Sequence, residues 1–141
     1  MFNLKFLKKP IVFGLILQVT NIIEITIEFF HFKVPNGFPL ISFVLIVFIY
    51  SFFYKTKFNS KFIWQSMLWD WLFNLSIRMI QLYFKNEIAT FLRSFYDTIP
   101  TPYLLPTVFV LIIILFLLFL LSCLMLFVSN RLALKIIHKF Y

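Results

Sequence analysis

Residues 108–128 read VFVLIIILFLLFLLSCLMLFV, an apolar run without a single charged side chain. Its only polar side chains are the hydroxyl of Ser122 and the thiol of Cys123. An α-helix rises 1.5 Å per residue, so about 20 residues cross the roughly 30 Å hydrocarbon core of a bilayer. The stretch therefore predicts a transmembrane helix, and the rest of the chain decides how many others accompany it.

The composition of the whole chain fits a membrane protein. Its 141 residues are 62% hydrophobic and 13% charged, whereas a soluble domain is about 45–50% apolar and about 25% charged. A chain this short cannot bury so much apolar surface inside itself, because small domains bury a modest fraction of their surface. The net charge of +8 is therefore assigned to cations that flank membrane spans and not to binding of nucleic acid.

Four apolar segments predict an all-α integral membrane protein whose single transmembrane domain covers residues 1–141. The expected transmembrane helices are 10–32, 38–54, 63–84 and 104–128, and the second is slightly short for a full crossing. Short interfacial helices are expected near 88–96 and 130–140, the latter as a cationic, amphipathic continuation of the last span. No alternating ten-residue strands of a barrel are visible, and no cleavable signal is expected.

The distribution of lysine and arginine predicts the orientation of the four helices. With four spans, the N-terminus, the second loop and the C-terminus share one side of the membrane. That side holds most of the cations: Lys5, Lys8, Lys9, Lys55, Lys57, Lys61, Arg131, Lys135 and Lys139. The other side holds Lys33, Lys85 and Arg93. The bias places both chain ends on the cytoplasmic or matrix side, where phospholipids with anionic headgroups are expected partners.

The first segment carries a polar stripe inside an apolar helix. In TNIIEITIEFFHFK (20–33), the stripe falls within an arc of about 80° at 100° per residue, and Gln18 lies near its edge. Its members follow one another at spacings of three, four and three: Asn21, Glu24, Glu28 and His31.

The third segment repeats the pattern with Asp70, Asn74 and Arg78 on one face, flanked by Ser66 and Gln81. A charge at the bilayer centre costs a few kcal/mol, so a compensating partner is expected. Asp70 and Arg78 are two turns apart with Asn74 between them, and Arg78 is alternatively a partner for a glutamate of the first helix. The spacing leaves these pairings open.

The stripes favour one function and leave alternatives to it. The favoured one is polar contact between helices or subunits, and the main alternative is a proton or ion path lined by the carboxylates. Glu28-x-x-His31 matches one Glu-x-x-His element of a di-iron carboxylate site, but no second copy of the element exists and the later helices lack glutamate. Ligation of haem by His31 would need a second buried histidine as the other axial ligand, and none is expected. The single cysteine, Cys123, excludes an internal disulfide and a cysteine metal site. No catalytic motif, metal or cofactor is therefore expected.

Three stretches resemble the short, Phe-rich hydrophobic proteins encoded in ciliate mitochondrial genomes. They are FNLKFLKKP (2–10), FVLIVFIYSFFYKTKFNSKF (43–62) and LIIILFLLFLLSCLMLF (111–127), and the resemblance is one of composition and length over the whole chain. It implies a non-catalytic subunit of a respiratory-chain or ATP-synthase complex in the mitochondrial inner membrane, with other membrane subunits as partners. A bacterial small membrane protein of unknown role is a third reading.

Overall fold

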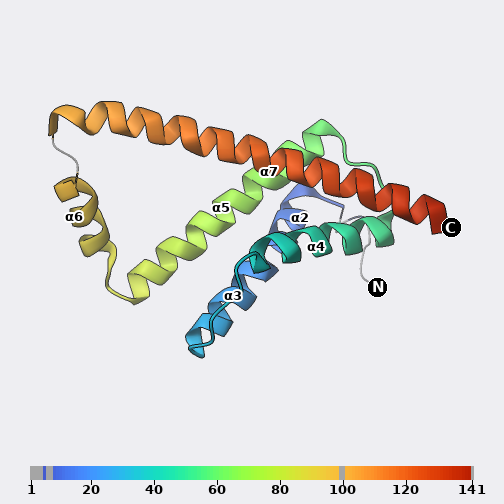
Figure 1. The fold of residues 1–141 in the computed structure, drawn as a ribbon, viewed down its shortest axis with the longest axis horizontal. Coiled ribbons are helices and arrows are strands. Elements are labelled where there is room, and N and C mark those ends of the chain that lie inside the picture. The colour runs from blue at the N-terminus through green and yellow to red at the C-terminus, as the bar shows by residue number, and fades with distance from the viewer. Residues whose placement is uncertain (1–4, 6–7, 99–100, 141) are drawn as a thin grey trace. The chain divides into compact units, whose positions relative to one another are not determined.

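The computed structural model describes residues 5, 8–98 and 101–140, and most of them are helical. No β-strand occurs within these residues, so the predicted all-α class is confirmed. Figure 1 follows the elements in chain order. They are α2 (Pro10–Leu17), α3 (Val19–Phe29), α4 (Phe38–Tyr54), α5 (Ser60–Phe84), α6 (Ile88–Thr98), the 3₁₀ helix η1 (Thr101–Tyr103) and α7 (Leu104–Phe140).

Among the described residues, two helical stretches are long and apolar enough to cross a membrane. The first is Pro10–Phe29, formed by α2 and α3, whose most apolar 18-residue window has a mean hydropathy of 1.8. The second is α7, whose most apolar 18-residue window has a mean hydropathy of 3.4. The 17-residue helix α4 is apolar but shorter, and α5 has 25 residues that include Asp70 and Arg78.

The first predicted helix is interrupted in the structure. Gln18 separates α2 from α3 with a ψ angle of −12°, and its backbone N–H donates to the carbonyl of Leu15 at 3.1 Å, in the tighter i→i−3 pattern of a 3₁₀ turn. The Thr20 hydroxyl donates to the Leu17 carbonyl at 3.0 Å, which satisfies a carbonyl released at the break. The prediction of one continuous helix over 10–32 is therefore wrong at Gln18.

The same helix also ends earlier than predicted, at Phe29. The N–H of His31 donates to the Glu28 carbonyl at 2.9 Å, and that of Phe32 donates to the Ile27 carbonyl at 3.2 Å. These two bonds form a Schellman motif, in which the residue after the C-cap adopts a left-handed conformation. That residue is His31, with a φ of 61°, so the histidine assigned to the helical stripe lies just beyond the helix.

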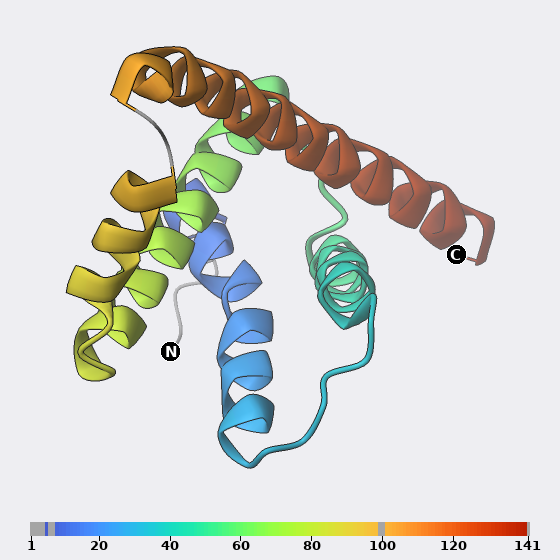
Figure 2. The same ribbon diagram turned by 60° about the vertical axis from the view of Figure 1, so that its left-hand side comes forward.

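Pro35, Asn36 and Gly37 turn the chain from α3 into α4. Gly37 has a φ of 92°, which a residue without a Cβ adopts without steric cost, and the Phe38 N–H donates to the Pro35 carbonyl at 3.1 Å. Helix α4 then occupies Phe38–Tyr54, the range predicted from the sequence. Figure 2 shows the open connection that joins α3 to α4.

Helix α5 begins at Ser60, three residues before the predicted start. Asn59 caps it, because its side-chain oxygen accepts a hydrogen bond from the Phe62 N–H at 2.7 Å. The helix ends at Phe84 as predicted, in a second Schellman motif with Asn86 in the left-handed position at a φ of 54°.

Of the final two helices, α6 matches the prediction and α7 differs from it. Helix α6 covers Ile88–Thr98, where a short helix was expected. The continuation of the last span expected near 130–140 is helical, but it is not a distinct short helix, because α7 runs unbroken from Leu104 to Phe140. No proline or glycine follows Pro106 in this stretch, so nothing in the backbone stops the helix. Its 37 residues measure about 55 Å, against roughly 30 Å of hydrocarbon.

The described residues group into two compact units. One contains the residues up to Asn74 and those from Ser122 onward, and the other contains Leu75–Leu121. The first unit has an aromatic core around Phe13, which is fully buried. The ring centroid of Phe13 lies 4.5 Å from that of Tyr50, 5.3 Å from that of Phe58 and 5.6 Å from that of Phe62. Such tilted and edge-on ring pairs stabilise beyond their buried area.

Within the first unit, α2 and α5 cross with their backbones in contact. A Cβ added to Gly14 would lie 2.9 Å from the Trp69 Cβ and 3.0 Å from both the Asp70 nitrogen and the Ser66 carbonyl oxygen. Only glycine fits at this crossing. One of the two glycines of the chain therefore allows close packing of two helices.

Candidate functional site

A polar cluster lies where α2 and α3 meet α5. The side-chain amide of Gln18 donates to the Asp70 carbonyl oxygen at 2.8 Å and to the Asp70 carboxylate at 2.5 Å. Its oxygen accepts a hydrogen bond from the Asn21 amide at 2.6 Å. Because a backbone carbonyl can only accept, the orientation of the Gln18 amide is fixed. Gln18 is only 3% exposed.

This cluster gives Asp70 and Asn21 partners inside the chain. Both were predicted to make polar contacts, but the residue that joins them, Gln18, was placed at the edge of the stripe. The sequence signal for it is a lone polar side chain within the apolar run 10–19 that precedes the stripe. The hydrogen bonds keep the Asp70 carboxylate supplied with a donor, as an acidic group among apolar helices requires.

A second buried polar residue, Asn130, links α7 to the loop between α4 and α5. Its side-chain oxygen accepts from the Phe58 N–H at 3.0 Å, while its nitrogen donates to the Ser51 hydroxyl at 2.9 Å and to the Thr56 carbonyl at 3.2 Å. The amide is 1% exposed. Sequence reasoning missed it because Asn130 follows the apolar run and was grouped with the cationic tail.

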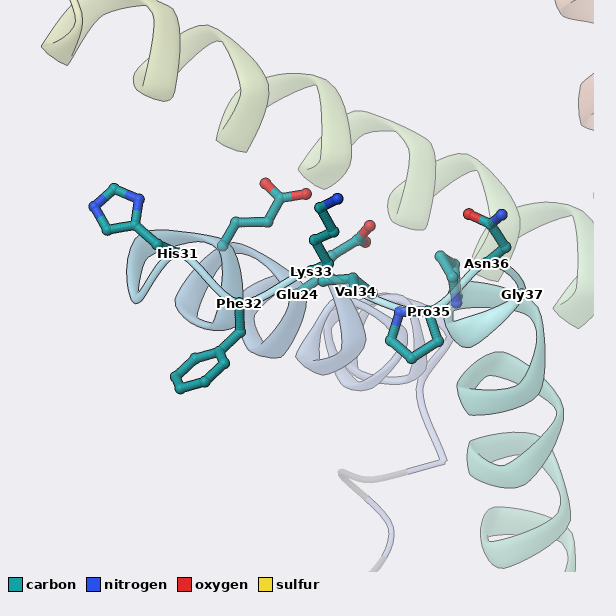
Figure 3. Close-up of a pocket in the computed structure, with 10 residues that line it drawn as sticks. Glu24, His31, Phe32, Lys33, Val34, Pro35, Asn36 and Gly37 are labelled. Atoms are coloured by element: carbon teal, nitrogen blue, oxygen red, sulfur yellow. The ribbon is translucent and has the colours of Figure 1, made fainter.

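Glu24, Glu28 and His31 line a polar cavity of about 580 Å³ at the end of α3. Lys33 and the turn Pro35–Gly37 complete its wall. Figure 3 shows the side chains of Glu24 and Lys33 extending to the same side of α3. Glu28 and His31 are exposed and Glu24 is partly buried.

None of the described residues donates a hydrogen bond to the carboxylate of Glu24 or Glu28, or forms an ion pair with either. Large apolar side chains of the same helix are exposed around them, including Ile22, Ile23 and Phe29. The two carboxylates are therefore accessible to the surroundings of the helix.

The remaining predicted contact residues lie on α5. Asn74 is half-buried in the first unit. Arg78 belongs to the second unit, is exposed, and donates to the Gln81 side-chain oxygen of its own helix at 3.3 Å. The pairing of Asp70 with Arg78, or of Arg78 with Glu24 or Glu28, remains a prediction.

Most large apolar side chains of α7 face outward. Those between Phe109 and Leu118 are 37–65% exposed, and contiguous apolar surface of this extent is typical of lipid or protein contact. No group of three or more histidine, cysteine or acidic side chains in the described part of the chain is placed to hold a metal ion.

Comparison of the chain with known protein families, with curated protein sequences and with solved structures finds no match.

Proposed function

We propose that this protein is a non-catalytic integral membrane subunit of a respiratory-chain or ATP-synthase complex in the mitochondrial inner membrane. The observation that carries the proposal is the open acidic face of α3. Glu24 and Glu28 take no partner from the described residues, yet they lie on a stretch apolar enough to cross a membrane. In hydrocarbon such groups are costly, and a neighbouring subunit with hydrogen-bond donors or cations removes that cost.

The proposed arrangement has four spans formed by α2–α3, α4, α5 and α7. Helix α4 is short for a full crossing, and lysines at its C-terminal end reach the interface by extending along it. The hydrogen bond from Gln18 to Asp70 supports burial of the polar face of α5 against α2. The mitochondrial location and the kind of complex come from the resemblance in composition and length.

Co-migration with a large complex tests the assignment. In solubilised native membranes separated on a native gel, mass spectrometry should find the wild-type chain in a high-mass band with other membrane subunits. The double variant Glu24→Gln, Glu28→Gln should reduce its share in that band about tenfold, because interhelical polar contacts contribute about 1–2 kcal/mol each in model systems. Glu87→Gln, which changes an exposed carboxylate outside the helices, should leave the band unchanged. A wild-type chain that migrates alone overturns the proposal.

The polar cavity beside Glu24, Glu28, His31 and Lys33 favours a second candidate, a proton- or ion-conducting subunit. A carboxylate that carries protons must titrate, so Glu24→Gln would abolish flux. The test is ion flux into liposomes that contain only the purified chain. Flux that is lost in Glu24→Gln and retained in Glu87→Gln would place this function above assembly.

A further inference from the structure

The C-terminal end of α4 lies between a cationic cavity and an apolar groove. The cavity measures about 180 Å³, and Lys8, Lys57, Thr56 and Asn59 supply its polar wall. The groove measures about 290 Å³ and is lined by Ile16, Ile46, Ile49, Tyr50, Phe53 and Tyr54. Tyr50 lines both, so the polar and apolar spaces adjoin at one side chain.

Lys8 reaches across the boundary between these two spaces. Its ammonium nitrogen lies 5.7 Å from the centroid of the Tyr54 ring, within the range of a cation–π contact. Tyr54 belongs to the apolar groove, while Lys8 belongs to the cationic cavity. The positive charge is therefore held at the mouth of the groove.

The groove continues along α4 toward the end of α7. Ile49 and Phe53 also line a neighbouring apolar pocket of about 270 Å³, whose other wall includes Ala133, Ile136 and Ile137. From Tyr54 to Ile46, α4 runs about 12 Å. A ligand that fits must have an anionic head at the lysines and an apolar part that extends along the helix.

We propose that this is a binding site for an anionic phospholipid, with its phosphate at Lys8 and Lys57 and an acyl chain against Ile46, Ile49 and Phe53. Charge complementarity selects the headgroup, and the apolar walls select a lipid over free phosphate. Tyr50 and Tyr54 line the groove, and tyrosine is enriched where headgroups meet hydrocarbon. The inference rests only on the membrane location within the proposed function and on no partner subunit.

The test uses the purified full chain in detergent, with lipid binding followed by native mass spectrometry. Phosphatidylglycerol should bind more tightly than phosphatidylcholine. The double variant Lys8→Gln, Lys57→Gln should weaken phosphatidylglycerol binding about 30-fold, since each lysine near a headgroup contributes about 1 kcal/mol. The matched variant Lys135→Gln, Lys139→Gln removes the same charge outside the cavity and the grooves, and should change binding less than threefold.

A second variant tests the acyl part of the site. Ile46→Trp fills the groove without changing charge, and should weaken both lipids equally while leaving the chain folded. Equal binding of the two lipids by the wild type, equal effects of the two lysine pairs, or competition by millimolar inorganic phosphate would overturn the assignment. A chain that washes off membranes in alkaline carbonate would instead refute the proposed function, so the two failures are distinguishable.

Discussion

At the scale of single residues, Asn130 joins parts of the chain that are far apart in sequence. It holds the backbone of Phe58 and Thr56 and the side chain of Ser51. All of these groups lie near a fully buried amide, so water cannot replace it. A lone asparagine after an apolar run gives no hint of this role, because its partners lie more than 70 residues earlier.

Replacing Asn130 by alanine should destabilise the protein by about 1–3 kcal/mol, since the Phe58 N–H is left buried without an acceptor. Denaturant unfolding in detergent micelles, followed by circular dichroism, measures the change. Gln65→Ala, at an exposed position of α5, should stay within about 0.5 kcal/mol of the wild type. Equal stability of the two variants would contradict the role given to Asn130.

His31 offers a residue-scale prediction of the opposite sign. Its left-handed conformation at the end of α3 is one that glycine adopts without cost. His31→Gly should therefore raise the unfolding free energy by about 0.5–1 kcal/mol, and His31→Val should lower it, because a β-branched side chain disfavours a positive φ. Thermal unfolding of the three proteins in one detergent gives the order. A destabilised His31→Gly would indicate that the imidazole makes a contact that outweighs the backbone effect.

At the scale of the elements, apolar run length predicted the helices well and their interruptions poorly. The bounds of α4 and the end of α5 follow from the sequence, because Gly37 precedes one and Asn86 follows the other. The break at Gln18 does not, since it coincides with a contact to Asp70 on another helix that run length cannot show. A helical continuation beyond 128 follows from the sequence, but the absence of any break before it does not, because the change from apolar to cationic residues suggests a boundary there.

The crossing of α2 and α5 gives the prediction at this scale. Gly14→Ala should destabilise the protein by about 1–3 kcal/mol, because the new Cβ would press on the backbone of α5. Leu15→Ala removes atoms from a side chain that is 49% exposed. It should therefore destabilise the protein less than Gly14→Ala. Unfolding of both variants in the same micelles compares them, and a Gly14→Ala protein as stable as the wild type would show that the helices can separate freely.

At the scale of the whole molecule, the four-span topology predicts which loops share a side of the membrane. Cysteines placed at Asn36 and Asn86 in a Cys123→Ser background should react with an impermeant maleimide from one side. Cysteines at Lys57 and His138 should react only from the other. Labelling of Asn36 and Asn86 from opposite sides would show that α4 and α5 do not both cross.

The sequence predicts the class of the molecule more directly than it predicts the function. Composition and the run at 108–128 predict a membrane protein, and two helices of the described residues are long and apolar enough to cross a membrane. The polar stripes were visible as stripes, but Asp70 proved to have a partner in Gln18 while Glu24 and Glu28 have none among the described residues. Periodicity shows which residues share a helix face. Only the fold shows which of them already have a hydrogen-bond partner within the chain.

The three bonds of Asn130 have a consequence for the cationic loop that they hold. The segment around Thr56 and Phe58 is fixed before any ligand arrives, so Lys57 between them has less freedom to lose when a phosphate binds. Preorganisation of this kind strengthens association without adding a contact. Loss of the Asn130 amide would then lower headgroup affinity while every positive charge stays in the molecule.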